Sequence, residues 1–238
     1  MTSAFPSAKP AKDIQAVLSG GYTLSQGAGG YIQSGLALIQ KNPSVYIGAA
    51  VLIFALSALP TLLDVSVLKL ATLIVMPPLT ASIYIVGIRL VKGEQTDFPD
   101  LLEGFQQFVP LVLASIVGSL LVILGLICLI VPGIYLATSY SLVQPLIIDR
   151  RLGFWSALET SRKIVTKNWW SFFGLSFLIG LIFGLLSLVI LIPVVLILGR
   201  DGGQTIIVIV SNAISSVGFA VYSSSLLAMY IDILGLRD

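Results

Sequence analysis

Chemically active side chains are scarce in this chain, and their densest cluster lies in residues 156–170. The cluster holds three cations and two tryptophans: Arg162, Lys163, Lys167, Trp169 and Trp170. On a helical wheel the cations lie opposite an apolar face, which comprises Trp155, Leu158, Ser161, Val165 and Trp169. Helices with cations opposite aromatic rings lie in the membrane interface, where cations attract anionic headgroups. The pattern therefore predicts an interfacial helix.

Two interpretations of these cations stay open. The first is a specific site for a lipid headgroup, formed by Arg150, Arg151, Arg162, Lys163, Lys167, Trp169 and Trp170. The second is general anchoring of a positively charged cytoplasmic face. A nucleic-acid partner is not expected, because three cations on one short helix give little electrostatic attraction and the formal net charge is only +2.

The residue inventory argues against an enzyme. The chain has no histidine, which removes histidine-based acid–base chemistry, catalytic triads and histidine metal sites. Cys128 is the single cysteine, so no internal disulfide can form. Residues 27–30 are glycine-rich, but Ile32 occupies the position of the third glycine of a dinucleotide loop, and we interpret them as a linker. We expect no catalytic, cofactor-binding or metal site, and a lipid enzyme would have only the pair Asp149 and Asp232 to use.

Polar side chains inside apolar runs suggest a second kind of site. A hydrophilic cavity for a polar substrate would be lined by Gln144, Asn212, Ser215 and Ser216. Small and hydroxyl-bearing residues also let membrane helices approach closely. The same residues, with the glycine pair Gly180 and Gly184, therefore favour tight packing of the last two apolar runs, and the cavity remains the alternative.

The elements that carry these residues are those of a membrane protein. The chain is 57% hydrophobic and 10% charged, whereas a soluble domain has roughly 25% charged residues. Apolar runs of more than ~18 residues are long enough to cross the hydrocarbon core as helices. We predict an all-α, polytopic helical bundle with about six transmembrane helices, at residues 43–63, 66–90, 110–131, 133–148, 169–192 and 205–233. Pro193 predicts a bend or an early end in the fifth.

Amphipathic segments precede alternate spans. About three interfacial helices are expected, at residues 30–42, 98–108 and 153–168. Each precedes two spans, which indicates either an internal triplication or merely three hairpins with short outer turns. Residues 1–27 are rich in Ala, Ser, Gly and Pro and predict a flexible tail without the apolar region of a signal peptide. Residues 28–238 form a single membrane domain in this prediction.

Basic residues predict the orientation. Six spans put both termini on one side, and 11 of the 13 lysines and arginines fall on that side. Only Lys69 and Arg200 fall on the other. By the positive-inside rule both termini are cytoplasmic, and we expect a multi-pass protein of an inner (cytoplasmic) membrane.

Four short motifs carry a family resemblance. They are LIVPGIY at 129–135, VQPLIID at 143–149, ALETS at 157–161 and NWWSFF at 168–173. Together they resemble a group of six-span bacterial membrane proteins, which includes uncharacterised families and the membrane domain attached to some glycerophosphodiester phosphodiesterases. The resemblance covers mainly residues 97–185 and implies fold and topology. It does not imply hydrolysis, because that activity uses histidines in a soluble barrel of ~250 residues, for which this chain has neither the residues nor the length.

The sequence favours a non-enzymatic integral membrane protein that organises lipid or a membrane protein complex. Interfacial segments dominate, whereas charges within the spans, which usually mark function, lie near the span ends. The expected partners are anionic membrane lipids and a membrane protein, with the oligomeric state left open. The alternative is a small transporter or permease-like component that moves a lipid or small solute. A bundle without a cavity lined by Gln144 and Asn212 would argue against transport.

Overall fold

Helices make up almost the whole of the chain. The computed structural model describes residues 10–237, apart from the side chains of residues 198–202. Over this range the chain is all-α, as predicted, with one isolated bridge between Pro10 and Leu236. The helices are α1 Ile14–Gly20, α2 Ala28–Lys41, α3 Pro43–Leu62, α4 Ser66–Lys92, η1 Phe98–Gln107, α5 Phe108–Cys128, α6 Ile130–Ser139, α7 Val143–Arg150, α8 Phe154–Lys167, α9 Trp169–Gly202 and α10 Gln204–Leu234. Six helical segments are long and apolar enough to cross a membrane, which confirms the predicted class.

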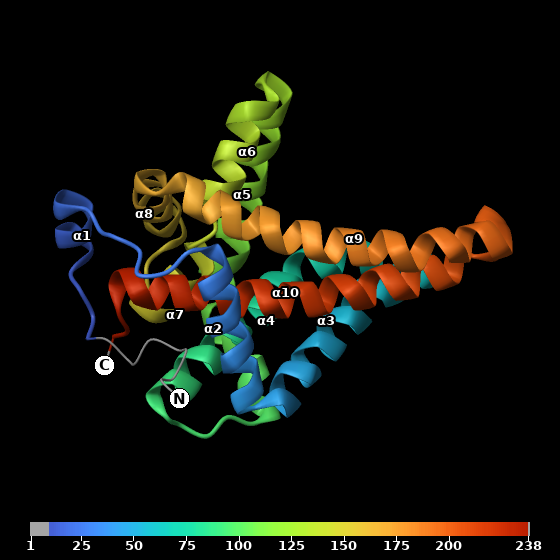
Figure 1. Ribbon diagram of the computed structural model, residues 1–238, viewed down its shortest axis with the longest axis horizontal. Coiled ribbons are helices and arrows are strands. Elements are labelled where there is room, and N and C mark those ends of the chain that lie inside the picture. The colour runs from blue at the N-terminus through green and yellow to red at the C-terminus, as the bar shows by residue number, and fades with distance from the viewer. Residues whose placement is uncertain (1–9, 238) are drawn as a thin grey trace.

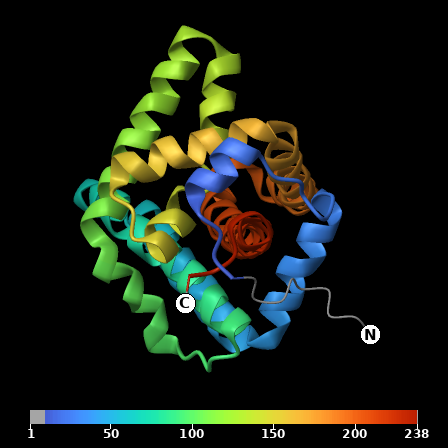
Figure 2. The same cartoon turned by 90° about the vertical axis from the view of Figure 1, so that its left-hand side faces the viewer.

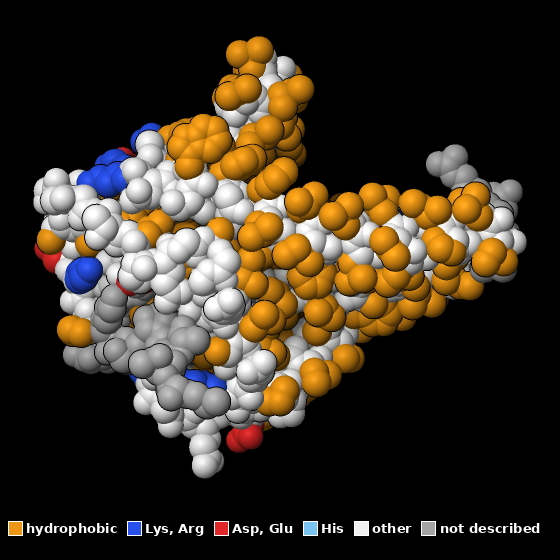
Figure 3. All heavy atoms as spheres, viewed as in Figure 1, with side chains coloured by type: hydrophobic (Ala, Val, Ile, Leu, Met, Phe, Trp, Pro, Cys, Tyr) orange, Lys and Arg blue, Asp and Glu red, His pale blue; other side chains and the backbone are white. Residues whose placement is uncertain are grey.

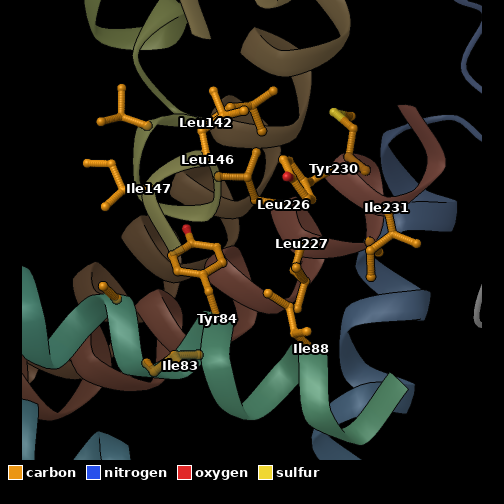
Figure 4. Close-up of a cluster of buried hydrophobic side chains, with 14 of the residues drawn as sticks. Ile83, Tyr84, Ile88, Leu142, Leu146, Ile147, Leu226, Leu227, Tyr230 and Ile231 are labelled. Atoms are coloured by element: carbon orange, nitrogen blue, oxygen red, sulfur yellow. The ribbon is translucent and has the colours of Figure 1, made fainter. Parts of the chain in front are cut away.

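The buried side chains gather in one part of the molecule, which we call the head. The C-terminal halves of α4 and α10 form its centre, and α10 lies in contact with α2, α3, α4 and α9. Figure 2 shows α10 end-on, surrounded by the other elements of the head. Apolar side chains from α4, α7 and α10 interlock there, including Tyr84, Leu146 and Leu227 (Figure 4). Burial of each such side chain away from water stabilises the head by about 1.5–3 kcal/mol.

Three helical hairpins leave the head, and we call them the arms. They are α3 with the first half of α4, α5 with α6, and α9 with the first half of α10 (Figure 1). Many of their large apolar side chains are exposed, and the charged side chains visible in Figure 3 lie on the head. A water-soluble protein rarely exposes so large a continuous apolar surface. The arms are therefore the parts of the chain that contact the hydrocarbon of a membrane.

Small residues allow helices to approach closely inside the head, but they are not the glycines that the sequence predicted. A Cβ on Gly35 would lie 2.6 Å from the backbone nitrogen of Ser225, so α2 and α10 approach closely at this point. By contrast, a Cβ on Gly180 or Gly184 would have no other atom within 4 Å. The predicted role of these two glycines in close packing of α9 on α10 was wrong. On this pair of helices the close approach lies at Gly218, next to the ring of Phe183.

Local structure differs from the sequence expectations at two prolines. The predicted fourth span, 133–148, consists of α6 and α7, with residues 140–142 in a turn between them. Pro145 explains the break, because a proline ring clashes with a helical carbonyl four residues earlier but is tolerated in a first turn, which is its position in α7. Pro193, however, does not end α9, which continues to Gly202.

The N-terminal segment also differs from the expectation. The sequence predicted a flexible tail over residues 1–27; residues 1–9 lie outside the described range, whereas residues 10–27 contain α1 and lie against the head. The Asp13 carboxylate caps α1 by accepting a hydrogen bond from the Gln15 backbone nitrogen at 3.1 Å. Other contacts join this segment to residues far along the chain, such as the hydrogen bond from the Ser25 nitrogen to the Asp232 carboxylate at 2.8 Å.

Candidate lipid-binding site

Helix α8 carries three of the seven predicted headgroup residues, Arg162, Lys163 and Lys167, on its outer side. Leu158, Ile164 and Val165 are buried against the head. Ser161, which the helical wheel put on the apolar face, is also buried: its hydroxyl donates to the Ser139 carbonyl at 2.7 Å and accepts from the Leu142 nitrogen at 3.1 Å. This side chain therefore satisfies backbone groups at the break between α6 and α7. The amphipathic pattern places α8 at the surface with its cations outward.

Lys167 is exposed, but its ammonium group binds another segment of the protein. Its ammonium group donates to the carbonyls of Val17 and Leu18, in the last turn of α1. A cation at a helix C-terminus stabilises the carbonyls that have no helical partner. The adjacent Tyr22 hydroxyl donates to the Ile164 carbonyl at 3.0 Å, and burial raises the pKa of Tyr22 to about 12. Lys167 thus holds the N-terminal segment on α8.

Arg150 likewise binds other segments of the protein. Its Nε lies 2.8 Å from the carboxylate of Asp149, whose side chain is only 3% exposed. The same guanidinium donates from Nη2 to the Leu234 carbonyl at 2.8 Å and from Nη1 to the Lys12 carbonyl at 3.3 Å. The Tyr230 hydroxyl donates to Asp149 at 2.6 Å. Arg150 therefore joins α7, the end of α10 and the N-terminal segment.

Arg151 faces a different surface. It is exposed, has a left-handed backbone with φ of 54°, and lines a polar cavity of about 490 Å³ beside Lys92 and Arg237. Arg89 also lines this cavity and is neutralised by Glu103 at 2.8 Å and Asp100 at 2.7 Å. Because cations and carboxylates are mixed here, the cavity has no strong preference for an anion.

The remaining predicted headgroup residues lie around α8. Lys163 pairs with Glu159 at 2.8 Å, and this hydrogen bond lowers the pKa of the Glu159 carboxyl. Arg162 is exposed and lines a cavity of about 210 Å³ that does not include Arg151. Trp169 donates from its indole nitrogen to the Tyr135 carbonyl at 3.3 Å, and Trp170 is 77% exposed. The seven predicted residues are thus divided among separate surfaces and internal contacts.

The predicted cavity around Gln144 and span six is not assembled either. The Asn212 amide donates to the Val208 carbonyl at 2.8 Å within α10, and the Ser216 hydroxyl donates to the Ala213 carbonyl at 2.9 Å. Ser215 is exposed on the arm. The two cavities lined by Gln144 include none of these three residues.

Gln144 instead lines an open groove between α4 and α5, which we call the α4–α5 groove. Its volume is about 670 Å³. The lining combines an apolar wall with a row of polar side chains. The apolar wall consists of Leu73, Met76, Pro77 and Ile116. The polar row consists of Ser57, Lys69, Thr72, Thr80, Ser115, Ser119 and Gln144. A smaller cavity of about 280 Å³ shares Ser115, Ser119 and Gln144 with it. Polar atoms therefore run along a groove in the apolar part of the molecule.

The groove begins where the arms leave the head. Along α4 the side chains are exposed from Val67 to Ile74, apart from the half-buried Thr72, and buried from Pro77 to Tyr84, apart from the half-buried Thr80. Thr80 and Gln144 lie at this boundary, joined by a hydrogen bond from the Gln144 amide nitrogen at 3.0 Å. Lys69 lies at the other end, paired with Asp64 at 2.6 Å. Eleven residues of helix separate Thr80 from Lys69, which corresponds to about 16 Å.

Two polar groups of the groove are open to a ligand. The Thr72, Thr80 and Ser119 hydroxyls each donate to a carbonyl of their own helix. Within residues 10–237, by contrast, neither the carbonyl oxygen of Gln144 nor the hydroxyl of Ser115 has a hydrogen-bond partner. A polar group facing hydrocarbon without a partner costs several kcal/mol. The groove is therefore suited to a molecule with both polar and apolar parts.

The hydroxyl residues of this groove were not among the predicted site residues. Threonines and serines are ordinary in membrane helices, where they bond to their own backbone. A signal was nevertheless present, because Ser115 and Ser119 are four residues apart and share one helix face.

Among the described residues, no three Asp, Glu or Cys side chains are grouped in a way that could hold a metal ion.

No protein-family model, curated protein sequence or solved structure matches this chain. The resemblance to the six-span bacterial group therefore stays a prediction.

Proposed function

We propose that this chain is a non-enzymatic membrane protein that binds a phospholipid in the α4–α5 groove and so organises lipid around its arms. The observation that carries the proposal is a groove of about 670 Å³ with open polar groups at its base and apolar walls along its length. The surrounding arms are covered by exposed apolar side chains, so the medium that fills the groove is membrane lipid.

A phospholipid matches the groove from end to end. Its ester and glycerol region would lie at the base, near the Gln144 carbonyl and the Ser115 hydroxyl. One acyl chain would follow the wall formed by Met76, Leu73 and Ile116. Pockets for such ligands combine apolar walls with a few convergent polar groups. Apart from the groove, anionic headgroups of the surrounding membrane would meet the exposed cations of α8, Arg162 and Lys163.

The proposed location is an inner membrane, with the head and both termini on the cytoplasmic side. The support is the basic surface of the head, which the positive-inside rule assigns to the cytoplasm. A membrane protein partner belongs to the same proposal, because the arms expose more apolar side chains than they bury.

Transport of a lipid or small solute is the weaker proposal. It was based on one cavity shared by Gln144 and the polar residues of span six, and these groups line no common cavity. Binding of a lipid from the side needs no such passage.

We expect leucines at two groove serines to displace the bound lipid. In Ser115→Leu/Ser119→Leu the larger side chains fill the groove from α5. Native mass spectrometry of protein extracted in mild detergent would then show lipid occupancy reduced about tenfold, equivalent to ~1.4 kcal/mol of binding free energy.

The matched control is Ser211→Leu/Ser215→Leu. It makes the same chemical change at the same four-residue spacing on α10, outside the groove. Its lipid occupancy should equal that of the unmodified protein. Equal occupancy in the control and in the groove variant would refute the groove as the binding site.

A further inference from the structure

The outer turns of the three arms differ in polarity. The α3–α4 turn carries the ion pair of Asp64 and Lys69, and the α9–α10 turn carries the sequence Arg200-Asp201-Gly202-Gly203-Gln204. The α5–α6 turn has the sequence LICLIVPG, residues 126–133, without a charged or hydrogen-bonding side chain except the thiol of Cys128. Ile127 and Val131 are 75% and 76% exposed. A turn that emerges into water has polar residues, so this turn is suited to hydrocarbon.

The length of the α5–α6 arm points to the same conclusion. Helix α8 contacts α5 where Leu158 would lie 3.3 Å from a Cβ on Gly118. The charged Arg162 of α8 lines one cavity with Leu121 and Tyr140, so this level of α5 and α6 is at the membrane interface. From there to the turn, α6 has 10 residues, which rise about 15 Å. The hydrocarbon core is about 30 Å thick, so even a hairpin directed along the membrane normal would reach only its middle.

Hydrogen bonds inside the hairpin satisfy both backbone groups of Leu129, the residue at the centre of the turn. Between α5 and α6 only Leu129 leaves the helical conformation. Its nitrogen donates to the Gly125 carbonyl at 3.0 Å, and its carbonyl accepts from the Gly133 nitrogen at 3.4 Å. A Cβ on Gly125 would lie 3.1 Å from the Cα of Gly133, so the two helices meet closely at glycines. Backbone inside hydrocarbon must be satisfied in this way.

We propose that α5 and α6 form a re-entrant hairpin that enters the membrane from the side of the head, ends among acyl chains and returns to the same side. The segments Phe98–Cys128 and Ile130–Arg150, which contain α5 and α6, are candidate spans by length and composition, yet the turn does not reach the far surface. Figure 1 shows this hairpin projecting in a direction different from that of α9–α10. The partner of the turn is the hydrocarbon of the bilayer, and this inference is independent of lipid binding in the α4–α5 groove.

The single cysteine allows a direct test, because Cys128 is exposed in the turn. A nitroxide is attached to Cys128 of the otherwise unmodified protein in detergent, and the protein is reconstituted into bilayers of phosphatidylethanolamine and phosphatidylglycerol. Relaxation of the nitroxide is measured with oxygen, which dissolves in hydrocarbon, and with a nickel chelate, which stays in water. The comparison positions are the other two turns, as Asp64→Cys and Gln204→Cys in a Cys128→Ser background.

For the nitroxide at Cys128 we expect strong relaxation by oxygen and little relaxation by the nickel chelate. The nitroxides at Asp64→Cys and Gln204→Cys should be relaxed strongly by the chelate. A response to the chelate at Cys128 equal to that at Asp64→Cys would mean that the hairpin crosses the membrane, and would overturn the proposal. Protection from both agents would mean that protein covers the turn, and would overturn it as well. The decisive measurement uses the native residue, so it does not depend on a variant that folds.

Discussion

Replacement of Arg150 by alanine is expected to lower the free energy of unfolding of the head by about 3–5 kcal/mol. Loss of one partner of a buried ion pair has this cost, because the remaining charge stays buried without compensation. The Asp149 carboxylate would retain only the Tyr230 hydroxyl and the Arg237 backbone nitrogen as donors. The carbonyls of Leu234 and Lys12 would lose their contact with the guanidinium. Thermal or SDS-induced unfolding in mild detergent measures the change.

The adjacent arginine is the natural control for this prediction. Arg151→Ala removes the same group one residue away, but Arg151 is exposed and within residues 10–237 has no ion pair. Surface substitutions of this kind change stability by about ±0.5 kcal/mol at most. Similar losses from Arg150→Ala and Arg151→Ala would show that Arg150 is not the link between α7 and α10.

The second large effect is expected at Gly104, where η1 crosses α4. A Cβ there would lie 1.9 Å from the Pro78 carbonyl oxygen and 2.5 Å from the Ser82 hydroxyl. Gly104→Ala therefore has to push η1 away from α4. The hydrogen bond from the Gly104 nitrogen to the Ser82 hydroxyl, 3.0 Å long, is then lost. Overpacking of this kind costs about 1–3 kcal/mol, measurable in the same unfolding assay and as faster proteolysis near residue 98.

Gly184→Ala makes the same chemical change, but it is not expected to lower the stability of the protein. A Cβ at this position on α9 meets no other atom within 4 Å. Because glycine is a weaker helix former than alanine by about 1 kcal/mol, stability should be unchanged or slightly higher. Destabilisation of Gly184→Ala to the level of Gly104→Ala would mean that α9 packs against something at this glycine.

The arrangement of head and arms connects these stability effects to lipid. The Arg150 contacts and the η1–α4 contact hold together the elements from which the arms extend. The base of the α4–α5 groove lies at this junction, since Thr80 is two residues from both Pro78 and Ser82. A variant that loosens η1 should therefore also retain less lipid, whereas Gly184→Ala should not.

Much of the architecture follows from the sequence by itself. Hydropathy identifies the six apolar helices, and the periodicity of residues 153–168 identifies α8 and its outward cations. These properties are local, because the length of an apolar run and the spacing of charges determine whether a segment enters hydrocarbon and which of its faces is polar. The absence of histidine is likewise a property of composition.

Only the tertiary structure decided what each polar side chain contacts. Lys167 belongs to the same polar pattern as Lys163, yet it binds carbonyls of α1 from 149 and 150 residues away in the chain. Arg150 and Arg151 are neighbours in sequence, but one joins buried elements and the other faces a cavity. The groove with Ser115 and Gln144, and the short reach of α5–α6, also depend on which helices meet. Periodicity defines a face of a helix, but the partner of that face is set by long-range packing.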